Sequence, residues 1–452
     1  MSEQNFPQLK NSNNDIALTE EDKSYSFADV NQAIDKFATG LLNGSDDLNE
    51  ERIAFFIPAS VDYVTTMHGI WRAGGIAIPL NVASAVAELE HYLSCASVTR
   101  MIANGKYQES LRELCAEMNI ELLSVADVMA EEAGPLPVIA DERRAMMLFT
   151  SGTTNKPKGV VSTHKTIRAQ ITTLIEAWSW TDQDSIPLFL PVHHIHGIIN
   201  ILSCGLWAGA TVHLFSKFDI PKITAEIVAG TYNVFMAVPT IYVKLIQYFD
   251  TIDESEVKNI CAGFRAMRLN ISGSAACPVK LFEQWKELTG QVLLERYGMT
   301  EIGMGISNPY NGERRAGHVG QALPNVQAQL FDEDNKPVTE ENTPGEIRIK
   351  GDNVFLEYWA NEEATKESFH DGWFCTGDVA VLDDGYYRIM GRSSIDIIKS
   401  GGYKLSALEI EGTLLTHDDV AECAVIGVED ETWGESVMAF IGLKAGASME
   451  YE

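Results

Sequence analysis

The chain has 452 residues, 45% of them hydrophobic, with 34 basic and 64 acidic side chains and a formal net charge of −30. This length exceeds one ordinary hydrophobic core and predicts two or three globular domains. So acidic a surface repels phosphate backbones and anionic lipid, which argues against a nucleic-acid or membrane partner.

The N-terminal segment carries no recognisable targeting signal. The first 22 residues hold one lysine, no arginine and no apolar run, so neither a secretory signal nor a transit peptide is visible. No stretch approaches the roughly 20 apolar residues that a membrane span requires. Seven cysteines are scattered without a C-x-x-C pair, which predicts free thiols in a reducing compartment. The expected location is therefore the cytoplasm.

Alternating strands and helices follow this segment. Apolar residues at helical spacing predict an amphipathic helix over Tyr25–Asn43, and short apolar runs predict buried strands. Strand, helix and strand in that order predict parallel βαβ units. The expected strands are Arg52–Ile57, Ile76–Leu80, Val212–Phe215, Val234–Val238 and Leu269–Ser272, and the expected helices are Val61–Ala73, Ile223–Val228, Ile241–Phe249 and Val279–Thr289.

From about Gln327 the pattern changes to short strands separated by Asp-, Asn- and Gly-rich turns, which predicts an antiparallel, barrel-like piece. Its expected strands are Ala328–Phe331, Gly345–Lys350, Val379–Leu382 and Tyr386–Met390. Past Gly391-Arg392 a final α+β segment begins, with a helix expected over Ala407–Thr416 and a strand over Glu422–Val428.

The segment Thr150–Gly159 is the strongest local signal. It lies between the apolar runs Met146–Phe149 and Val160-Val161 and supplies four hydroxyls, two glycines and two lysines with no acid. Such a loop suits a triphosphate, because small residues let backbone N–H groups approach the oxygens and ammonium groups offset their charge. It does not fit the Walker A pattern. On composition alone, a polar β-hairpin turn remains an open alternative.

The full pattern T-S-G-T-T-x-x-P-K-G resembles the signature of the acyl-adenylate-forming superfamily. Further segments that resemble this family follow in the expected order: Ile271–Ala275, Glu295–Glu301, Gly345–Ile347, Phe374–Asp378, and Gly391-Arg392 through Gly401-Gly402-Tyr403-Lys404. The resemblance covers nearly the whole chain from Phe27. It implies an α/β N-terminal domain over residues 1–391, made of two α/β sandwich subdomains and a small β-barrel, and a small α+β C-terminal domain over residues 392–452.

The resemblance also implies roles for individual residues. Tyr297 would stack on adenine, Asp378 would accept hydrogen bonds from the ribose, and Glu301 would hold Mg²⁺. The expected ATP- and AMP-binding residues are Thr150, Ser151, Gly152, Thr153, Thr154, Gly273, Ser274, Ala275, Glu295, Tyr297, Gly298, Met299, Asp378 and Arg392, and the expected catalytic residues are Lys158, Thr300 and Glu301.

The acid is expected to be malonate or methylmalonate, because Asn233–Tyr242, Glu295–Glu301 and Asn311–Gly320 resemble malonyl-CoA synthetases. A dicarboxylate would leave one carboxylate in the pocket, which needs a cation or a bidentate donor. The residues expected to bind this second carboxylate are Arg315 and His194, with Arg268 as a weaker candidate. A solvated arginine pair at Arg314-Arg315 is the alternative, and the enzyme would then activate a fatty or aromatic acid.

The second step implied by the resemblance is thioester formation with coenzyme A at Ser400, Gly401 and Gly402, where short side chains let a pantetheine arm pass. The C-terminal domain would swing about a hinge in Arg392–Asp396. The family's C-terminal lysine motif is not found before Glu452. The expectation is therefore a partial C-terminal domain, and a further alternative is a catalytically weak adenylate-binding protein.

Overall fold

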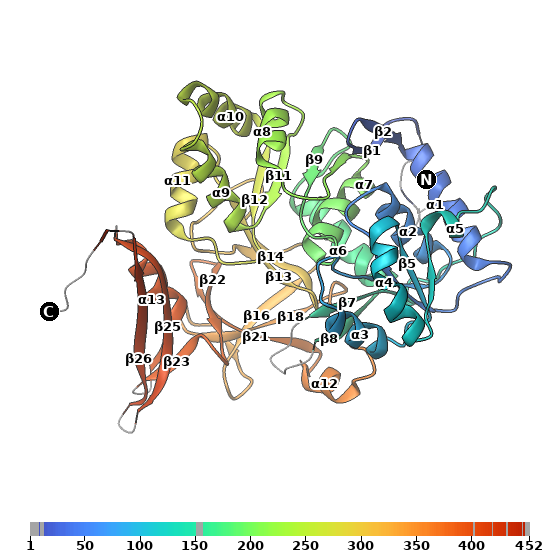
Figure 1. Ribbon diagram of the computed structural model, residues 1–452. Coiled ribbons are helices and arrows are strands. Elements are labelled where there is room, and N and C mark those ends of the chain that lie inside the picture. Colours follow the sequence, from blue (N-terminus) through green and yellow to red (C-terminus); the bar gives the residue numbers. More distant parts are fainter. Residues whose placement is uncertain are drawn as a thin grey trace.

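The computed structural model describes residues 9, 13–150, 157–400, 403–417, 419–430, 433–444 and 446–447. Figure 1 shows a large body formed by the blue to orange part of the chain, and a separate red unit that ends at the C-terminus. The predicted α/β body, antiparallel piece and small C-terminal unit are all present, so the predicted fold class is confirmed.

The first layer is a seven-stranded sheet in the order β19-β8-β7-β4-β3-β5-β6. Its β3 and β4 are parallel, as predicted, because α2 connects them. The helix α1 begins at a capping box, in which Ser26 and Asp29 satisfy each other's backbone N–H groups. The elements are α1 (Phe27–Leu42), β3 (Arg52–Phe56), α2 (Val61–Arg72), β4 (Ile76–Pro79), α3 (Val86–Cys95), β5 (Arg100–Ala103), α4 (Gly105–Glu117), β6 (Glu121–Leu123), α5 (Val125–Val128), β7 (Arg144–Thr150), β8 (Lys158–Thr163) and β19 (Glu357–Tyr358).

The second α/β unit has a five-stranded sheet in the order β11-β12-β13-β14-β15, whose first three strands are parallel. A core of interlocking rings, including Tyr242, Phe264 and Trp285, fixes its helices against the sheet. The elements are α8 (Ile220–Val228), β11 (Val234–Ala237), α9 (Pro239–Phe249), α10 (Glu254–Ala266), β12 (Leu269–Ser272), α11 (Val279–Thr289), β13 (Leu294–Met299), β14 (Gly303–Ser307) and β15 (Gln321–Ala322).

One part of the predicted strand series is wrong. The strand β10 does not continue into the sheet of β11, because it pairs with β1 and β9 in a separate four-stranded sheet in the order β2-β1-β10-β9. The N-terminal strand β1 supplies the edge that β10 needs, and no local pattern around β10 reveals that distant partner. The elements are β1 (Ile16–Glu20), β2 (Lys23–Ser26), α6 (His164–Ala177), β9 (Ser185–Leu188), the π-helix η1 (His196–Ser203), α7 (Cys204–Ala208) and β10 (Thr211–Leu214).

The antiparallel piece follows, and its longest strand, β21, pairs with β18, β20 and β22. Figure 1 shows these strands between the α/β body and the C-terminal unit. The elements are β16 (Gln327–Phe331), β17 (Pro337–Val338), β18 (Gly345–Lys350), α12 (Glu362–Glu367), β20 (Phe369–His370), β21 (Trp373–Asp383) and β22 (Tyr386–Arg392).

The C-terminal unit is a four-stranded sheet in the order β24-β23-β26-β25, with α13 against it. Its elements are β23 (Ile397–Ser400), β24 (Tyr403–Ser406), α13 (Ala407–Leu414), β25 (Val420–Asp430) and β26 (Gly434–Leu443). Among the helices of the described residues, none combines the length and apolar composition needed to cross a bilayer.

Candidate active site

The predicted phosphate loop joins β7 to β8. These strands are antiparallel neighbours, and Thr150 pairs with Lys158 where the hairpin opens. The predicted residues Ser151, Gly152, Thr153 and Thr154 lie outside the described residues. Because Thr150 and Lys158 bracket the loop, their positions show where the phosphates of a bound nucleotide are expected.

Lys158 lies beside an acidic group from a distant part of the chain. Its Nζ is 4.9 Å from the ring centre of Tyr358, and the Tyr358 hydroxyl donates to Oε1 of Glu301 at 3.0 Å. Glu301 lies two residues after the end of β13, whereas Tyr358 lies on β19, which pairs with β8. The edge strand β19 therefore brings the loop lysine and the predicted magnesium ligand together.

The Glu301 carboxylate is buried, with 5% of its residue surface exposed. Burial raises its pKa, and hydrogen bonds together with the charges of Arg392 and Lys158 act in the opposite direction. The described residues contain no group of three or more His, Cys, Asp or Glu side chains placed to share a metal ion. Nucleotide-bound Mg²⁺ needs only one or two carboxylates besides phosphate oxygens and water. The single carboxylate of Glu301 beside the phosphate loop therefore fits that ion.

A second group of contacts joins the α/β body to the antiparallel piece. The Tyr297 hydroxyl on β13 donates to Oδ2 of Asp378 at 2.5 Å, and Nε of Arg392 lies 2.9 Å from Oδ1 of the same carboxylate. Asp378 and Arg392 are direct partners across β21 and β22. Burial raises the pKa of Asp378, and its contacts with Tyr297 and Arg392 oppose that rise. The predicted adenine and ribose residues therefore lie at one junction.

The loop after β12, which contains Gly273 and Ser274, lies on the side of β13 that Arg296 faces. A Cβ atom added at Gly273 would lie 2.6 Å from Cζ of Arg296, so any larger residue there would require the guanidinium to move. Ser274 has a positive φ of 67° and is exposed. Its Oγ accepts from Nη2 of Arg296 at 3.2 Å and lies 3.1 Å from Nδ1 of His196. The buried side chains of Arg296 and His196 therefore both contact the hydroxyl of the exposed residue Ser274.

Glu295 faces the opposite side of β13. Its Oε1 accepts from the backbone N–H of Gly317 at 3.2 Å, and the N–H of Cys277 also donates to this carboxylate. Burial nevertheless dominates and raises the pKa of Glu295 to about 8. The residue thus anchors the loops after β12 and β14 rather than presenting its carboxylate to a nucleotide.

This raised pKa predicts a pH-dependent stability. An acid whose folded pKa exceeds its unfolded value of 4.5 binds a proton more tightly when folded, so stability is lost as the pH rises from about 4.5 to about 8. The slope from one group is at most about 1.4 kcal/mol per pH unit. Glu295→Gln is expected to remove this part of the slope in urea unfolding at pH 5 and pH 8. Exposed Glu287 on α11 provides the matched control, Glu287→Gln, and equal slopes in all three proteins would contradict the assignment.

Two of the three residues predicted to bind the distal carboxylate of the acid, Arg268 and Arg315, form ion pairs with acidic side chains of the protein. Arg268 forms two 2.6 Å contacts with buried Asp184, and it precedes β12, at the end opposite to Gly273. Five residue steps along the strand separate the backbone of Arg268 from that of Gly273 by about 17 Å. This position corrects the suggestion that Arg268 contacts the acid. Arg315 pairs with Glu313 at 3.1 Å and with Asp384 at 2.9 Å, over the ring of Tyr386.

The third residue predicted to bind the distal carboxylate, His194, lies just before η1. Its ring centre lies 4.1 Å from that of His193, with the two rings tilted by 53°, and burial lowers the pKa of His194. The π-helix η1 begins at His196, whose Nδ1 lies 3.1 Å from Oγ of Ser274. Single π-helical turns occur frequently at functional sites.

The predicted hinge adjoins the same junction, and the predicted CoA stretch begins at the end of β23. Beyond Arg392 the chain makes a tight turn, in which the N–H of Arg392 donates to Asp396 Oδ2 at 2.8 Å and the N–H of Asp396 donates back to the Arg392 carbonyl at 2.8 Å. Ser400 ends β23 opposite Tyr403, whereas the predicted Gly401 and Gly402 lie outside the described residues.

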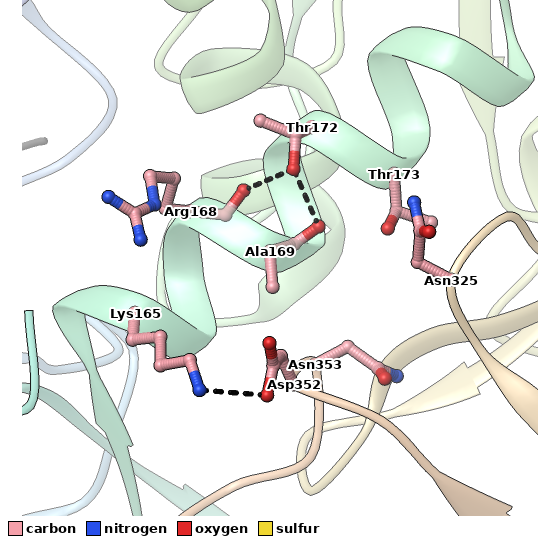
Figure 2. A pocket seen from close by; sticks show the side chains of 8 residues that line it. All are labelled: Lys165, Arg168, Ala169, Thr172, Thr173, Asn325, Asp352 and Asn353. Atoms are coloured by element: carbon pink, nitrogen blue, oxygen red, sulfur yellow. Dashed lines mark hydrogen bonds and ion pairs between the residues drawn. The ribbon is translucent and has the colours of Figure 1, made fainter. Parts of the chain in front are cut away.

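A cavity of about 220 Å³ lies elsewhere, along α6 (Figure 2). Its two cationic side chains already have carboxylate partners, since Lys165 lies 2.9 Å from Asp352 and Arg168 lies 2.5 Å from Asp141. The lining residues are Lys165, Arg168, Ala169, Thr172, Thr173, Asn325, Asp352 and Asn353. None belongs to the nucleotide motifs, so this cavity is not the candidate active site.

Sequence reasoning did not single out Tyr358, His196 or Arg296. A signal existed for Arg296, because side chains alternate along a strand and Arg296 stands between Glu295 and Tyr297. It must therefore face away from both, toward the neighbouring loop. No comparable signal exists for Tyr358, which lies 57 residues from Glu301.

Comparisons with known proteins identify the family of this chain. The family model described as AMP-binding enzyme matches residues 6–359, and the model for the AMP-binding enzyme C-terminal domain matches residues 409–452. The malonate–CoA ligase ACSF3 of Homo sapiens is 41% identical, over 90% of this chain and 76% of its own length. ATP-bound MatB from Rhodopseudomonas palustris superimposes with a TM-score of 0.89 at 31% identity, over 98% of this chain and 88% of that one.

A further solved structure is a malonyl-CoA ligase in a ternary product complex with methylmalonyl-CoA and AMP. It has a TM-score of 0.76 at 32% identity, and the match covers 97% of this chain and 91% of that one.

The same comparisons correct the expected location. The relatives from Bos taurus, Homo sapiens, Mus musculus and Xenopus laevis are all named as mitochondrial proteins, which overturns the expectation of a cytoplasmic enzyme. The physical reason is that an address segment is separate from the folded body and leaves no trace in its composition.

Proposed function

This chain belongs to the AMP-binding enzyme family, and from that premise we propose that it is an ATP- and CoA-dependent ligase that converts malonate or methylmalonate into its CoA thioester, AMP and pyrophosphate. The observation that carries the proposal is the meeting of two groups of residues at one junction. Lys158, Tyr358 and Glu301 form the first. Tyr297, Asp378 and Arg392 form the second. The malonate assignment is supported by the activities for which the relatives are named.

The second group is the proposed nucleoside site. The Tyr297 ring offers an apolar face to adenine, with the backbone of Gly273, Ser274 and Ala275 against the same base. In the free protein the Asp378 carboxylate is held by one phenol and one guanidinium. Both ribose hydroxyls can take the place of the Tyr297 hydroxyl, while the charge of Arg392 favours the ionised carboxylate.

The first group is the proposed phosphate site. Lys158 brings a positive charge to the phosphates, and Thr300 lies next to Glu301 at the end of β13. Glu301 would hold Mg²⁺, which supplies charge neutralisation as pyrophosphate departs. The substrate carboxylate attacks the α-phosphate, and the bond from that phosphorus to the pyrophosphate oxygen breaks, so an acyl-adenylate and pyrophosphate result.

Thioester formation is assigned to the C-terminal unit. The thiol of CoA attacks the carbonyl carbon of the acyl-adenylate, and AMP leaves. Ser400, Gly401 and Gly402 would border the pantetheine arm after the unit rotates about Arg392–Asp396. The reciprocal hydrogen bonds of that turn would have to exchange partners during rotation.

The test is a CoA-dependent AMP-release assay with malonate, methylmalonate, acetate, octanoate and benzoate. We expect kcat/KM for malonate or methylmalonate to exceed that for acetate, octanoate and benzoate by at least about 100-fold, because a site built to bind a polar group rejects acids without one. A preference for octanoate or benzoate, or no AMP release with either dicarboxylate, would contradict the proposal.

A further inference from the structure

Tyr358 contacts both charged residues of the proposed phosphate site. Its hydroxyl donates to Oε1 of Glu301 at 3.0 Å, and its ring centre lies 4.9 Å from Nζ of Lys158. Only 8% of its surface is exposed. An ionised carboxylate can only accept hydrogen bonds, and the face of an aromatic ring attracts an ammonium group. One phenol therefore engages the cation and the anion of this site at the same time.

The backbone around Tyr358 is held from two sides. The N–H of Trp359 donates at 2.8 Å to the carbonyl of Gly159, the glycine that ends the phosphate-loop motif. The N–H of Phe355 donates at 2.7 Å to the carbonyl of Glu301. The five residues from Phe355 to Trp359 thus connect the end of the loop to the predicted magnesium ligand. Because both connections are backbone hydrogen bonds, this segment fixes where the phenol lies between the two charged groups.

We propose that Tyr358 is a positioning residue for adenylate formation, which holds the Glu301 carboxylate and the Lys158 ammonium where a metal-bound triphosphate meets them. This inference rests on the proposed function and adds a residue to its phosphate site. The hydroxyl engages one oxygen of the carboxylate and leaves the other for Mg²⁺. The ring holds the ammonium at the edge of the phosphate loop. Tyr358 itself contacts neither the nucleotide nor the acid in this role.

A phenol between the two charges has an advantage over a direct ion pair. Burial raises the pKa of Glu301, and the charge of Lys158 opposes that rise, so the two groups already attract each other. Without Tyr358 they would be free to pair directly, and a buried pair must break before ATP and Mg²⁺ can bind. The ring attracts the ammonium without neutralising it, because an aromatic ring carries no net charge. Tyr358 therefore keeps both charges available to the ligand.

Two substitutions separate the hydroxyl from the ring. Tyr358→Phe removes only the contact with Glu301, whereas Tyr358→Leu removes both contacts. Calorimetric titration with ATP, once with Mg²⁺ and once with EDTA, measures binding apart from turnover. In Tyr358→Phe we expect the Kd with Mg²⁺ to rise at least about 10-fold, as for loss of a hydrogen bond to a charged group, and the Kd with EDTA to stay within about 2-fold. In Tyr358→Leu we expect the Kd with EDTA to rise at least about 3-fold as well.

Steady-state rates provide a second readout. The Mg²⁺ concentration for half-maximal AMP formation should rise about 10-fold in Tyr358→Phe, because a carboxylate that is no longer oriented binds the ion less well. The matched control is Tyr387→Phe. Tyr387 is also 8% exposed, and its hydroxyl donates at 2.8 Å to the carbonyl of Ala328, outside the phosphate site. This control is expected to change neither Kd nor the Mg²⁺ requirement.

The results that would overturn the inference are specific. They are equal losses with Mg²⁺ and with EDTA in Tyr358→Phe, or native binding and a native Mg²⁺ requirement in that variant. If Tyr358→Leu does not fold, Tyr358→Phe alone decides the question, because it keeps the ring. A native chain that binds ATP with Mg²⁺ but releases AMP with none of the five acids would instead refute the proposed function, and the two titrations would still test the role of Tyr358.

Discussion

Replacing Glu301 by glutamine is expected to lower malonate-dependent AMP formation about 1,000-fold, which corresponds to about 4 kcal/mol of transition-state stabilisation. Glutamine has the shape of glutamate, and its Oε1 can still accept the hydrogen bond from Tyr358, which spans 3.0 Å in the native protein. The change therefore removes a charge and a hard anionic ligand while it preserves packing. Steady-state rates over a range of Mg²⁺ concentrations provide the measurement.

The Mg²⁺ dependence separates this role from a structural one. If Glu301 holds the ion, the variant should need a much higher Mg²⁺ concentration for half-maximal rate, and AMP binding without metal should stay within about 3-fold of native. Glu363→Gln, at an exposed position of α12, should change neither quantity. A variant with the native rate and the native Mg²⁺ dependence would remove Glu301 from the phosphate site.

The sequence predicted the first and last residues of some elements correctly, because strong local signals mark their ends. The strand Leu269–Ser272 and the helix Val279–Thr289 agree with the structure at both ends. The helix begins after Pro278 and ends at Gly290, which has a positive φ of 75°. Proline and glycine at these positions are typical helix boundaries.

Other elements were missed because their signals are weak or non-local. The helix Glu254–Ala266 is mostly exposed, with three buried residues, Ile260, Cys261 and Phe264. The strand β10 was recognised, but its partner β1 lies almost 200 residues earlier. Pairing of that kind depends on the whole fold, because strand propensity alone does not select a neighbour.

The candidate site also combines residues that local motifs predict with contacts that only the whole fold creates. The family motifs predicted Tyr297 and Asp378 separately, and their direct contact follows only from the meeting of β13 with β21. Arg315 was a reasonable candidate by type and position, yet its loop directs it toward exposed Asp384. Arg296 lay inside a recognised motif, but its burial and its contact with Ser274 are apparent only in the structure.

Replacing Asp378 by alanine is expected to weaken AMP binding about 100- to 10,000-fold, because two charge-assisted hydrogen bonds to the ribose are lost at about 1.5–3 kcal/mol each. The variant also leaves Arg392 and the Tyr297 hydroxyl without the carboxylate that joins them. Asp378→Asn keeps an acceptor for Tyr297 but not the ion pair, so an intermediate loss is expected. Calorimetric titration with AMP measures both, and Asp371→Asn at an exposed turn is the control.

Because Arg392 begins the turn to the C-terminal unit, loss of its partner should also slow CoA-dependent thioester formation from a supplied acyl-adenylate. If that rate is unchanged while AMP binding falls, Asp378 serves the nucleoside alone and the hinge does not depend on the ion pair.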